Sequence, residues 1–411
     1  MTAPLSPAES REHRRIADIE FLRGVAILFV LFFHIRHGVI TWPMPALYHF
    51  LDNYFDFWPG VDIFFAVSGF VIARSLIPDL QACVSAPERV RVVTKFWIRR
   101  AWRLMPAAWL WLGLILLASA VLNRSGAFES FHVNFESAIA GLLSLADVRF
   151  GLSFPFLPYG PSSTYWSLSL EEQFYLALPL LVIAARSRLV PVLGGAVVLV
   201  FCGLPILSAA SAAWFNLSFA GLLGTFRLHA ILLGVLLAIF SRHPSYRLLE
   251  PTALGTSRLA RWGVLGGILM CLTAMAPLGQ GIVPFRFAVI AVLSAALVFI
   301  ASFDRDYLCR NSALKRVMLW VGSRSYALYL VHLPLYCLTR EIWFRLSPPG
   351  TVFGSADTWP FIATAVPMVL IAAELNYRFV ETPCRRYGIR LTSRTPEGPA
   401  EPAEAPTEAV A

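Results

Sequence analysis

Charged residues are scarce in this chain of 411 residues. Asp, Glu, Lys and Arg make up only 14% of the sequence, whereas 57% of the residues are hydrophobic and the mean hydropathy is +0.65. Soluble globular domains contain about 25% charged residues, so this composition excludes an ordinary soluble protein. We therefore predict a polytopic membrane protein.

Cysteines are also few, and their placement is irregular. The six cysteines form no CxxC pair and follow no regular spacing, which is typical neither of a disulfide framework nor of a metal site. We expect no metal and no permanently bound cofactor. Residues 1–20 lack the short apolar core and the small-residue cleavage site of a signal peptide, so we expect the first apolar span to be retained.

Apolar runs of about 20 residues, the length of a helix that crosses a bilayer, recur along the chain. They predict an all-α protein with about ten transmembrane helices around a polar central cavity. The expected spans are residues 19–40, 54–77, 102–122, 167–185, 189–209, 219–240, 259–278, 282–302, 318–338 and 359–380. The run at 136–148 is shorter, which indicates an interfacial or re-entrant segment.

The basic residues predict the orientation. The net charge is +9 and the isoelectric point about 9.5, and most Lys and Arg residues outside the spans fall in alternate loops. The positive-inside rule places these loops and both termini in the cytoplasm. We expect a cytoplasmic segment at 1–18, a transmembrane domain at 19–388 and a disordered cytoplasmic tail at 389–411, which is rich in Pro, Ala and Glu.

The first expected span carries two ionisable residues, Arg23 and His34. Because a helix turns about 100° per residue, both side chains lie on nearly the same face, and the rise of about 1.5 Å per residue separates them by roughly 16 Å. An ionisable group at this depth costs about 2.5–3.5 kcal/mol, so it rarely faces lipid. We expect both residues to line a cavity; a hydrogen bond that only fixes helix packing is the alternative for His34.

Four further polar residues are expected in the outer half of their spans, at the depth of His34. They are Glu171 and Glu172 at the start of the fourth span, Asp62 in the second and His332 in the ninth. Adjacent helices could bring them together around His34. The alternative for the two glutamates is a favourable position at a helix N-terminus, and for Asp62 and His332 it is a structural role.

The inner side has a different chemistry. Arg100 and Arg103 are three positions apart on one face of the helix that enters the membrane, and Arg23 is expected at a similar depth. Three guanidinium groups suit a phosphate-bearing ligand, although plain anchoring of the helix on the cytoplasmic side would also explain the first two.

Two other polar patterns are interpreted as internal charge satisfaction: Arg227 with His229, and Glu374 with Arg378 four positions later. The remaining groups describe a cavity with cations at its cytoplasmic mouth and a histidine with a carboxylate toward the exterior. A ligand with an anionic head and a long neutral arm that ends in the reactive group would fit. Acyl-coenzyme A (acyl-CoA) is one such ligand.

Taken together, these segments resemble the acyltransferase-3 family of integral membrane acyltransferases. Each motif alone is weak, and the resemblance rests on their order and spacing over residues 16–388. The matching pieces are Arg23 with His34, GVDIFFAVSGF at 60–70, Arg100 and Arg103 before Pro106, WSLSLEEQFYL at 166–176, RLHAILLG at 227–234, SYALYLVHLPL at 325–335 and RFVETPCRR at 378–386.

The resemblance implies a ten-helix acyltransferase in a bacterial cytoplasmic (inner) membrane. Such an enzyme moves an acyl group, often acetyl, from cytoplasmic acyl-CoA to a hydroxyl group, usually of a sugar. Carried over by position, His34 would be the catalytic histidine, Arg23 its motif partner, and Arg100 and Arg103 the contacts of the donor. Some relatives carry a further soluble domain of SGNH type, which we do not expect here.

The predicted cavity and the family resemblance lead to one mechanistic hypothesis. His34, oriented by Glu171 or another acid, removes the proton of the acceptor hydroxyl, while Arg23 and the arginine pair hold the CoA phosphates. The substrate-binding candidates are Asp62, Trp166 and His332.

The first choice of acceptor is a surface polysaccharide or lipid-linked glycan; the alternatives are a macrolide-type or lipid acceptor. A secondary transporter is a rival reading, but such proteins usually show an internal repeat, and the first and second five spans show none. We expect no nucleic-acid partner. The acyl chain length, the oligomeric state and a possible covalent intermediate stay open.

Overall fold

A computed structural model describes residues 16–43, 53–153, 158–203, 206–207, 227–277 and 285–393. These residues form helices and no strand, which confirms the all-α prediction. Among these residues, four helices are long and apolar enough to cross a membrane: Gly60–Ala82, Ala86–Val121, Tyr165–Gly203 and Ser355–Ser393. Two further apolar helices are shorter, His229–Phe240 and Arg286–Ser302. The protein is thus an integral membrane protein by its helices, and the number of ten spans stays a prediction.

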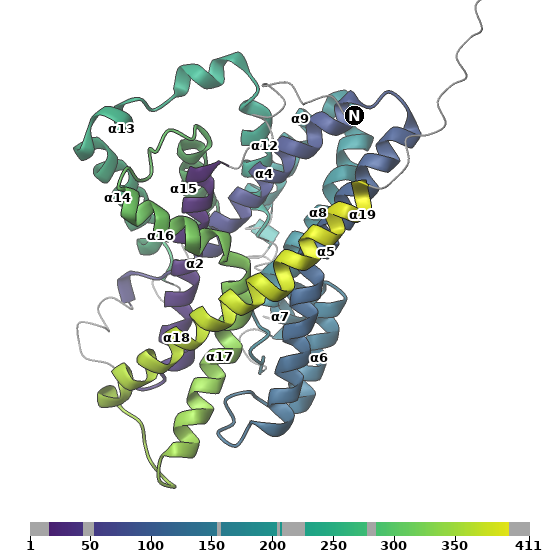
Figure 1. The fold of residues 1–411 in the computed structure, drawn as a ribbon. Coiled ribbons are helices and arrows are strands. Elements are labelled where there is room, and N and C mark those ends of the chain that lie inside the picture. Colours follow the sequence, from purple (N-terminus) through teal and green to yellow (C-terminus); the bar gives the residue numbers. More distant parts are fainter. Residues whose placement is uncertain are drawn as a thin grey trace, which may run out of the picture.

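Helix α2 (Ala17–His34) is the central element of the fold, and it continues as a π-helical turn over Ile35–Val39. Figure 1 shows it inside the bundle rather than at the periphery. It contacts α4 (Gly60–Ala82), α15 (Arg286–Ser302), α16 (Ser312–Ser323) and α17 (Ser325–Leu346). Arg23 and His34 therefore project among protein helices, as expected for ionisable groups at membrane depth.

The N-terminus of α2 is fixed by the segment that follows α15. Asp304 accepts a hydrogen bond from the backbone N–H of Ala17 (2.8 Å), and Asp18 accepts one from the N–H of Tyr307 (3.2 Å). The Tyr307 hydroxyl in turn donates to Glu250 (2.7 Å). Burial and this carboxylate raise the pKa of Tyr307 to about 12, so it stays a donor at neutral pH.

Helices α4 and α12 (His229–Phe240) cross in backbone contact. A Cβ atom on Gly69 would lie 2.2 Å from the carbonyl oxygen of Ile231, and one on Gly234 would lie 2.2 Å from that of Ala66. Only glycine allows such an approach, which is typical of packed membrane helices.

Helix α5 runs unbroken over Ala86–Val121 and begins with a capping box between Ser85 and Glu88. Its 36 residues measure about 54 Å, more than a bilayer core requires. The connection between the expected spans 54–77 and 102–122, which is one of the basic loops assigned to the cytoplasm, is thus largely helical. As a result, Arg100 and Arg103 are held by a rigid element.

A second long rod crosses the front of the molecule in Figure 1. It joins α18 (Thr358–Asn376), a π-helical turn at Tyr377–Glu381 and α19 (Thr382–Ser393). Helix α19 packs on α5, where Arg99 donates to the buried Thr392 hydroxyl (2.8 Å). The predicted disordered tail is therefore wrong for residues 389–393, because they belong to this packed helix; residues 394–411 lie outside the described part.

The run at 136–148 forms parts of two short helices, α6 (Phe131–Leu142) and α7 (Ala146–Ser153). At 12 and 8 residues, they are about 18 and 12 Å long and neither can cross a bilayer. They pack on α5 and on α8 (Tyr165–Ala185), respectively. The prediction of a non-spanning segment agrees with these lengths.

The remaining described elements complete the bundle. They are the 3-10 turn Arg186–Arg188, α9 (Leu189–Val198), the π-helical turn Leu199–Gly203, the 3-10 turn Pro244–Leu249, α13 (Ala253–Thr256), α14 (Arg258–Ala274) and the 3-10 turn Ser355–Asp357. Parts of the expected spans 189–209, 219–240, 259–278 and 282–302 lie outside the described residues.

The predicted boundaries of the span at 318–338 are wrong. The helix is interrupted at Arg324, so that α16 ends at Ser323 and α17 begins at Ser325. Arg324 donates to Glu374 of α18 (2.7 Å), and this ion pair accounts for a polar residue at the break.

We predict that the α4–α12 crossing limits stability. Replacing Gly69 or Gly234 by Ala should lower the free energy of unfolding by about 1–3 kcal/mol, because the new methyl group forces the backbones apart. Gly266→Ala in α14, where a Cβ meets nothing within 4 Å, is the matched control. Unfolding of the purified proteins in detergent measures the effect; equal stability of all three variants would contradict it.

Candidate active site

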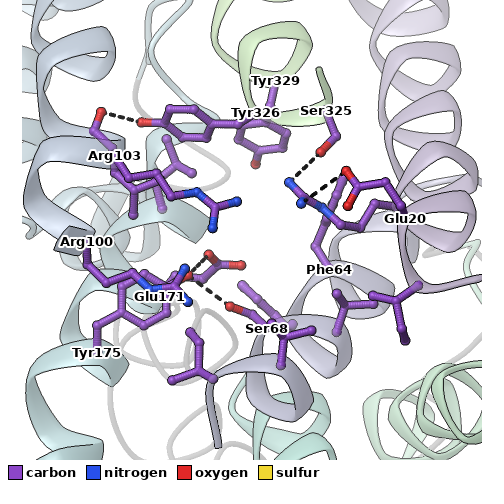
Figure 2. A pocket seen from close by; sticks show the side chains of 18 of the residues that line it. Glu20, Phe64, Ser68, Arg100, Arg103, Glu171, Tyr175, Ser325, Tyr326 and Tyr329 are labelled. Carbon is purple, nitrogen blue, oxygen red and sulfur yellow. Dashed lines mark hydrogen bonds and ion pairs between the residues drawn. The ribbon is translucent and has the colours of Figure 1, made fainter. Parts of the chain in front are cut away.

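A cavity of about 350 Å³ opens between α2, α4, α5, α8, α17 and the start of α19. Figure 2 shows side chains from several of these helices pointing into it. Its charged lining residues are Arg23, Arg74, Arg100, Arg103 and Arg385, with Glu20, Glu171 and Glu381. Positive charge is in excess, so the cavity favours an anionic ligand.

Arg23 reaches this cavity from the N-terminal half of α2. Its Nη2 donates to the Ser325 hydroxyl (2.8 Å), and its Nη1 lies 3.5 Å from a carboxylate oxygen of Glu20 one turn earlier. These two contacts fix the direction of the guanidinium. The interruption between α16 and α17 is what places Ser325 here.

Arg100 and Arg103 enter from α5, on one face of the helix (Figure 2). Neither donates a hydrogen bond to another described residue, and Nε of Arg103 is buried without a partner among them. The Arg100 guanidinium lies over the Tyr175 ring, 5.3 Å from its centroid. Buried donors are normally satisfied, so these groups are open to a ligand's acceptor oxygens.

The predicted place of Glu171 is wrong. Helix α8 begins inside the bundle at Tyr165, so Glu171 falls about 9 Å further along, where it faces the arginines rather than His34. It accepts a hydrogen bond from the Tyr175 hydroxyl (2.5 Å), which also contacts Ser68 (2.9 Å). Glu172 points elsewhere and accepts from Ser144 (2.6 Å).

The partner of His34 is another histidine. Nε2 of the fully buried His332 lies 3.2 Å from Nδ1 of His34, and each Nδ1 also contacts a carbonyl of its own helix, at 2.9 Å for Val30 and 3.1 Å for Leu328. A carbonyl can only accept, so for two neutral rings both Nδ1 atoms carry the proton. His34 then shares its Nδ1–H between Val30 and His332. Its Nε2 holds a free lone pair, as a general base requires.

Tyr329 separates the arginine cavity from the histidine pair. Phe64, Ser167 and Tyr329 line the cavity, and Tyr329 is its last lining residue along α17. The hydroxyls of Ser167 and Tyr329 are 2.5 Å apart. On its other side, the Tyr329 ring lies 5.7 Å from the ring of His332. Only Arg23 of the expected Arg23–His34 pair lines this cavity. The prediction that both residues line one cavity is therefore wrong for His34, because Tyr329 lies between the cavity and His332.

Asp62 and Trp166 lie together but outside the cavity. Asp62 is buried and forms an ion pair with Arg227, whose guanidinium sits 4.1 Å from the ring centroid of Trp58 and 5.7 Å from that of Trp166. This enclosed ion pair agrees with the internal charge satisfaction predicted for Arg227, although the partner is Asp62. Neither Asp62 nor Trp166 lines the arginine cavity, so the geometry favours a structural role, and their contact with substrate stays a prediction.

The other ionic pattern is as predicted. Glu374 of α18 pairs with Arg378 in the π-helical turn that follows, and it also accepts a hydrogen bond from Arg324 at the interruption between α16 and α17.

Several residues of the site escaped the sequence analysis. Tyr175 lies four positions after Glu171, and Tyr329 lies three before His332, so helical spacing could have found both. Glu381 and Arg385 belong to the closing RFVETPCRR segment, but nothing in the sequence shows that it returns to the first helix. Among the described residues, no three His, Cys, Asp or Glu side chains gather as a metal site.

The fold and site thus define a helical membrane protein in which an imidazole pair adjoins an arginine-lined cavity. The model of one family, described as acyltransferase domain, matches residues 16–375. The chain belongs to this acyltransferase-3 family. No solved structure matches it.

Curated relatives are similar over most of this chain. A Bacillus subtilis protein named "Putative peptidoglycan O-acetyltransferase YrhL" is 28% identical over 94% of this chain and 57% of its own length. The "Peptidoglycan O-acetyltransferase OatA" of Listeria monocytogenes is 27% identical over 91% and 56%, respectively. The "Putative O-acetyltransferase SACOL0978" of Staphylococcus aureus is 26% identical over 94% and 60%. The chain therefore spans less than two thirds of these relatives.

The structural role of Asp62 gives a prediction. Asp62→Ala should lower the free energy of unfolding by about 3–5 kcal/mol, because Arg227 stays buried without its partner. The double variant Asp62→Leu with Arg227→Met should recover most of this loss. Unfolding in detergent provides the measurement. An unchanged stability combined with weaker acceptor binding would return Asp62 to the substrate site.

Proposed function

We propose that this protein is a membrane O-acyltransferase that moves an acyl group, in the simplest case acetyl, from cytoplasmic acyl-CoA to a carbohydrate hydroxyl. One observation carries the proposal: Tyr329 lines the arginine cavity, and its ring also lies next to His332, the hydrogen-bond partner of His34. The family and the names of the relatives support acyl transfer to oxygen.

The donor would place its phosphates among Arg23, Arg100 and Arg103. Guanidinium groups bind phosphate through two parallel hydrogen bonds, and the last two have donors that no described residue engages. The neutral pantetheine arm would then pass Ser68 and Phe64, which line the same cavity. This path brings the thioester to Tyr329, next to the histidines.

The chemical step follows from the tautomer of His34. Its Nε2 removes the proton of the acceptor hydroxyl, and the oxygen attacks the thioester carbonyl. The new C–O bond forms as the C–S bond breaks, and the proton passes to the departing CoA sulfur. His332 acts as a positioning residue, since its Nε2 accepts a hydrogen bond from the Nδ1–H of His34 and so leaves Nε2 of His34 as the base.

The acceptor belongs to the proposal as well. Two of the relatives are named for peptidoglycan, which supports a cell-surface glycan as the source of the hydroxyl. The basic ends of α5 and α19 support a cytoplasmic face for the arginine cavity, in a bacterial cytoplasmic membrane with both termini inside. The donor would thus enter from the cytoplasm.

A reciprocal pair of variants tests the function. In the purified protein, His34→Ala should reduce acetyl transfer to a glycan acceptor by at least about 100-fold, the lower range for a lost general base, and leave the Kd for CoA unchanged. Arg103→Ala should raise the Kd for CoA about tenfold, because hydrogen bonds to a charged group are worth about 1.5–3 kcal/mol.

Two neighbours serve as controls. His37 is exposed one turn after His34, and Arg99 points to Thr392 instead of the cavity. Their alanine variants should keep both transfer and CoA binding. Full transfer by His34→Ala would remove this residue from the mechanism, and an unchanged Kd in Arg103→Ala would return that residue to membrane anchoring.

A further inference from the structure

A second cavity, of about 300 Å³, lies where three helices end together. It is bordered by the last turns of α4, by the junction of α8 and α9, and by the last turn of α12 with Arg242 just after it. Nothing in the proposed acyl transfer uses it.

The two cavities lie against opposite faces of α4. Ser68 and Ser75 line the arginine cavity, whereas Ala73, Ile77 and Gln81 line the second one at intervals of four residues. Ser75 and Ile77 are two positions apart, which corresponds to a rotation of about 200° around the helix. The second cavity is therefore a separate site.

Its charge is of one sign. Arg186 and Arg242 line it, and none of the described acidic residues does. Neither guanidinium forms an ion pair or a hydrogen bond with a described residue. Arg186 directly follows α8 and has a positive φ of 48°, which is unusual for a residue other than glycine. Both side chains are exposed, so they are free to meet an anion.

The rest of the lining is largely apolar, with Ile77, Leu189 and Ile239 among its residues. Helix α4 is apolar enough to cross a membrane, and the apolar segment Tyr165–Gly203 contains α8, which ends at Ala185 where the polar turn Arg186–Arg188 begins. The last turns of α4 and this polar turn border the same cavity, which favours a position near a bilayer surface. An anion that binds here meets two cations and an apolar wall at once. A free phosphate would use only the cations, whereas a phospholipid would also place its glycerol and upper acyl chains on the wall.

We propose that this cavity binds the phosphate headgroup of an anionic phospholipid. Arg186 and Arg242 hold the phosphate, and Ile77, Leu189 and Ile239 contact the apolar part. The site does not depend on the proposed catalytic function. Because the ligand binds the folded state alone, it stabilises the protein against unfolding.

The test uses the full chain in a neutral detergent. Dioleoyl-phosphatidylglycerol should raise the Tm in a saturable manner and remain bound in native mass spectrometry, whereas dioleoyl-phosphatidylcholine should do neither. The double variant Arg186→Gln with Arg242→Gln should weaken the apparent affinity at least tenfold. Arg188→Gln with Arg247→Gln, two exposed arginines that do not line the cavity, is the matched control and should bind as the unaltered protein does.

Three results would overturn the proposal. The first is an equal loss of affinity for phosphatidylglycerol in both double variants, and the second is an equal rise of the Tm with phosphatidylcholine. The third is an equal rise of the Tm with inorganic phosphate, which would make this a site for a free anion. The variant Arg186→Lys with Arg242→Lys keeps both charges and should retain binding, so loss of folding in the glutamine variant can be told apart from loss of the site.

Discussion

Several guanidinium groups share one cavity inside the helix bundle, and the surrounding structure must balance their positive charge. Like charges repel strongly where water is scarce, so each cation needs either a protein partner or a ligand. Arg23 has Ser325 and Glu20. Arg100 and Arg103 donate no hydrogen bond to a described residue, although the Arg100 guanidinium lies over the Tyr175 ring, and both project into the cavity from the unbroken helix α5. A phosphate-bearing donor would complete the set.

The same arrangement separates binding from chemistry. Glu171 stays with the arginines through Tyr175, and His34 stays with His332. Between the two groups stand Tyr329 and Ser167, joined by their hydroxyls. The negative charge of Glu171 is thereby kept away from His34, whose Nδ1 contacts the Val30 carbonyl and the ring of His332. If His34 is the base that we propose, His332 takes the place of the carboxylate that often orients a catalytic imidazole.

The features that could be predicted from the sequence depend on helical geometry and on the free-energy cost of placing a charged group in the bilayer. The scarcity of charge predicted the membrane class, and the cost of buried charge placed Arg23 with Arg100 and Arg103. Sequence reasoning failed where the position of one helix depends on its neighbours. Glu171 was assigned to the wrong depth because α8 begins inside the bundle, and the break at Arg324 depends on Glu374 in a distant helix. The His34–His332 contact joins residues 298 positions apart, and no local pattern encodes it.

The central claim is that the arginine cavity holds the donor with its thioester directed at the histidine pair. The most direct measurement is an experimental structure of the protein in lipid nanodiscs with a non-hydrolysable thioether analogue of acetyl-CoA. The account predicts phosphate oxygens within hydrogen-bond distance of Arg100 and Arg103, and the sulfur beside Tyr329 on the side of His332. An analogue bound outside this cavity, or one whose sulfur points away from Tyr329, would contradict it.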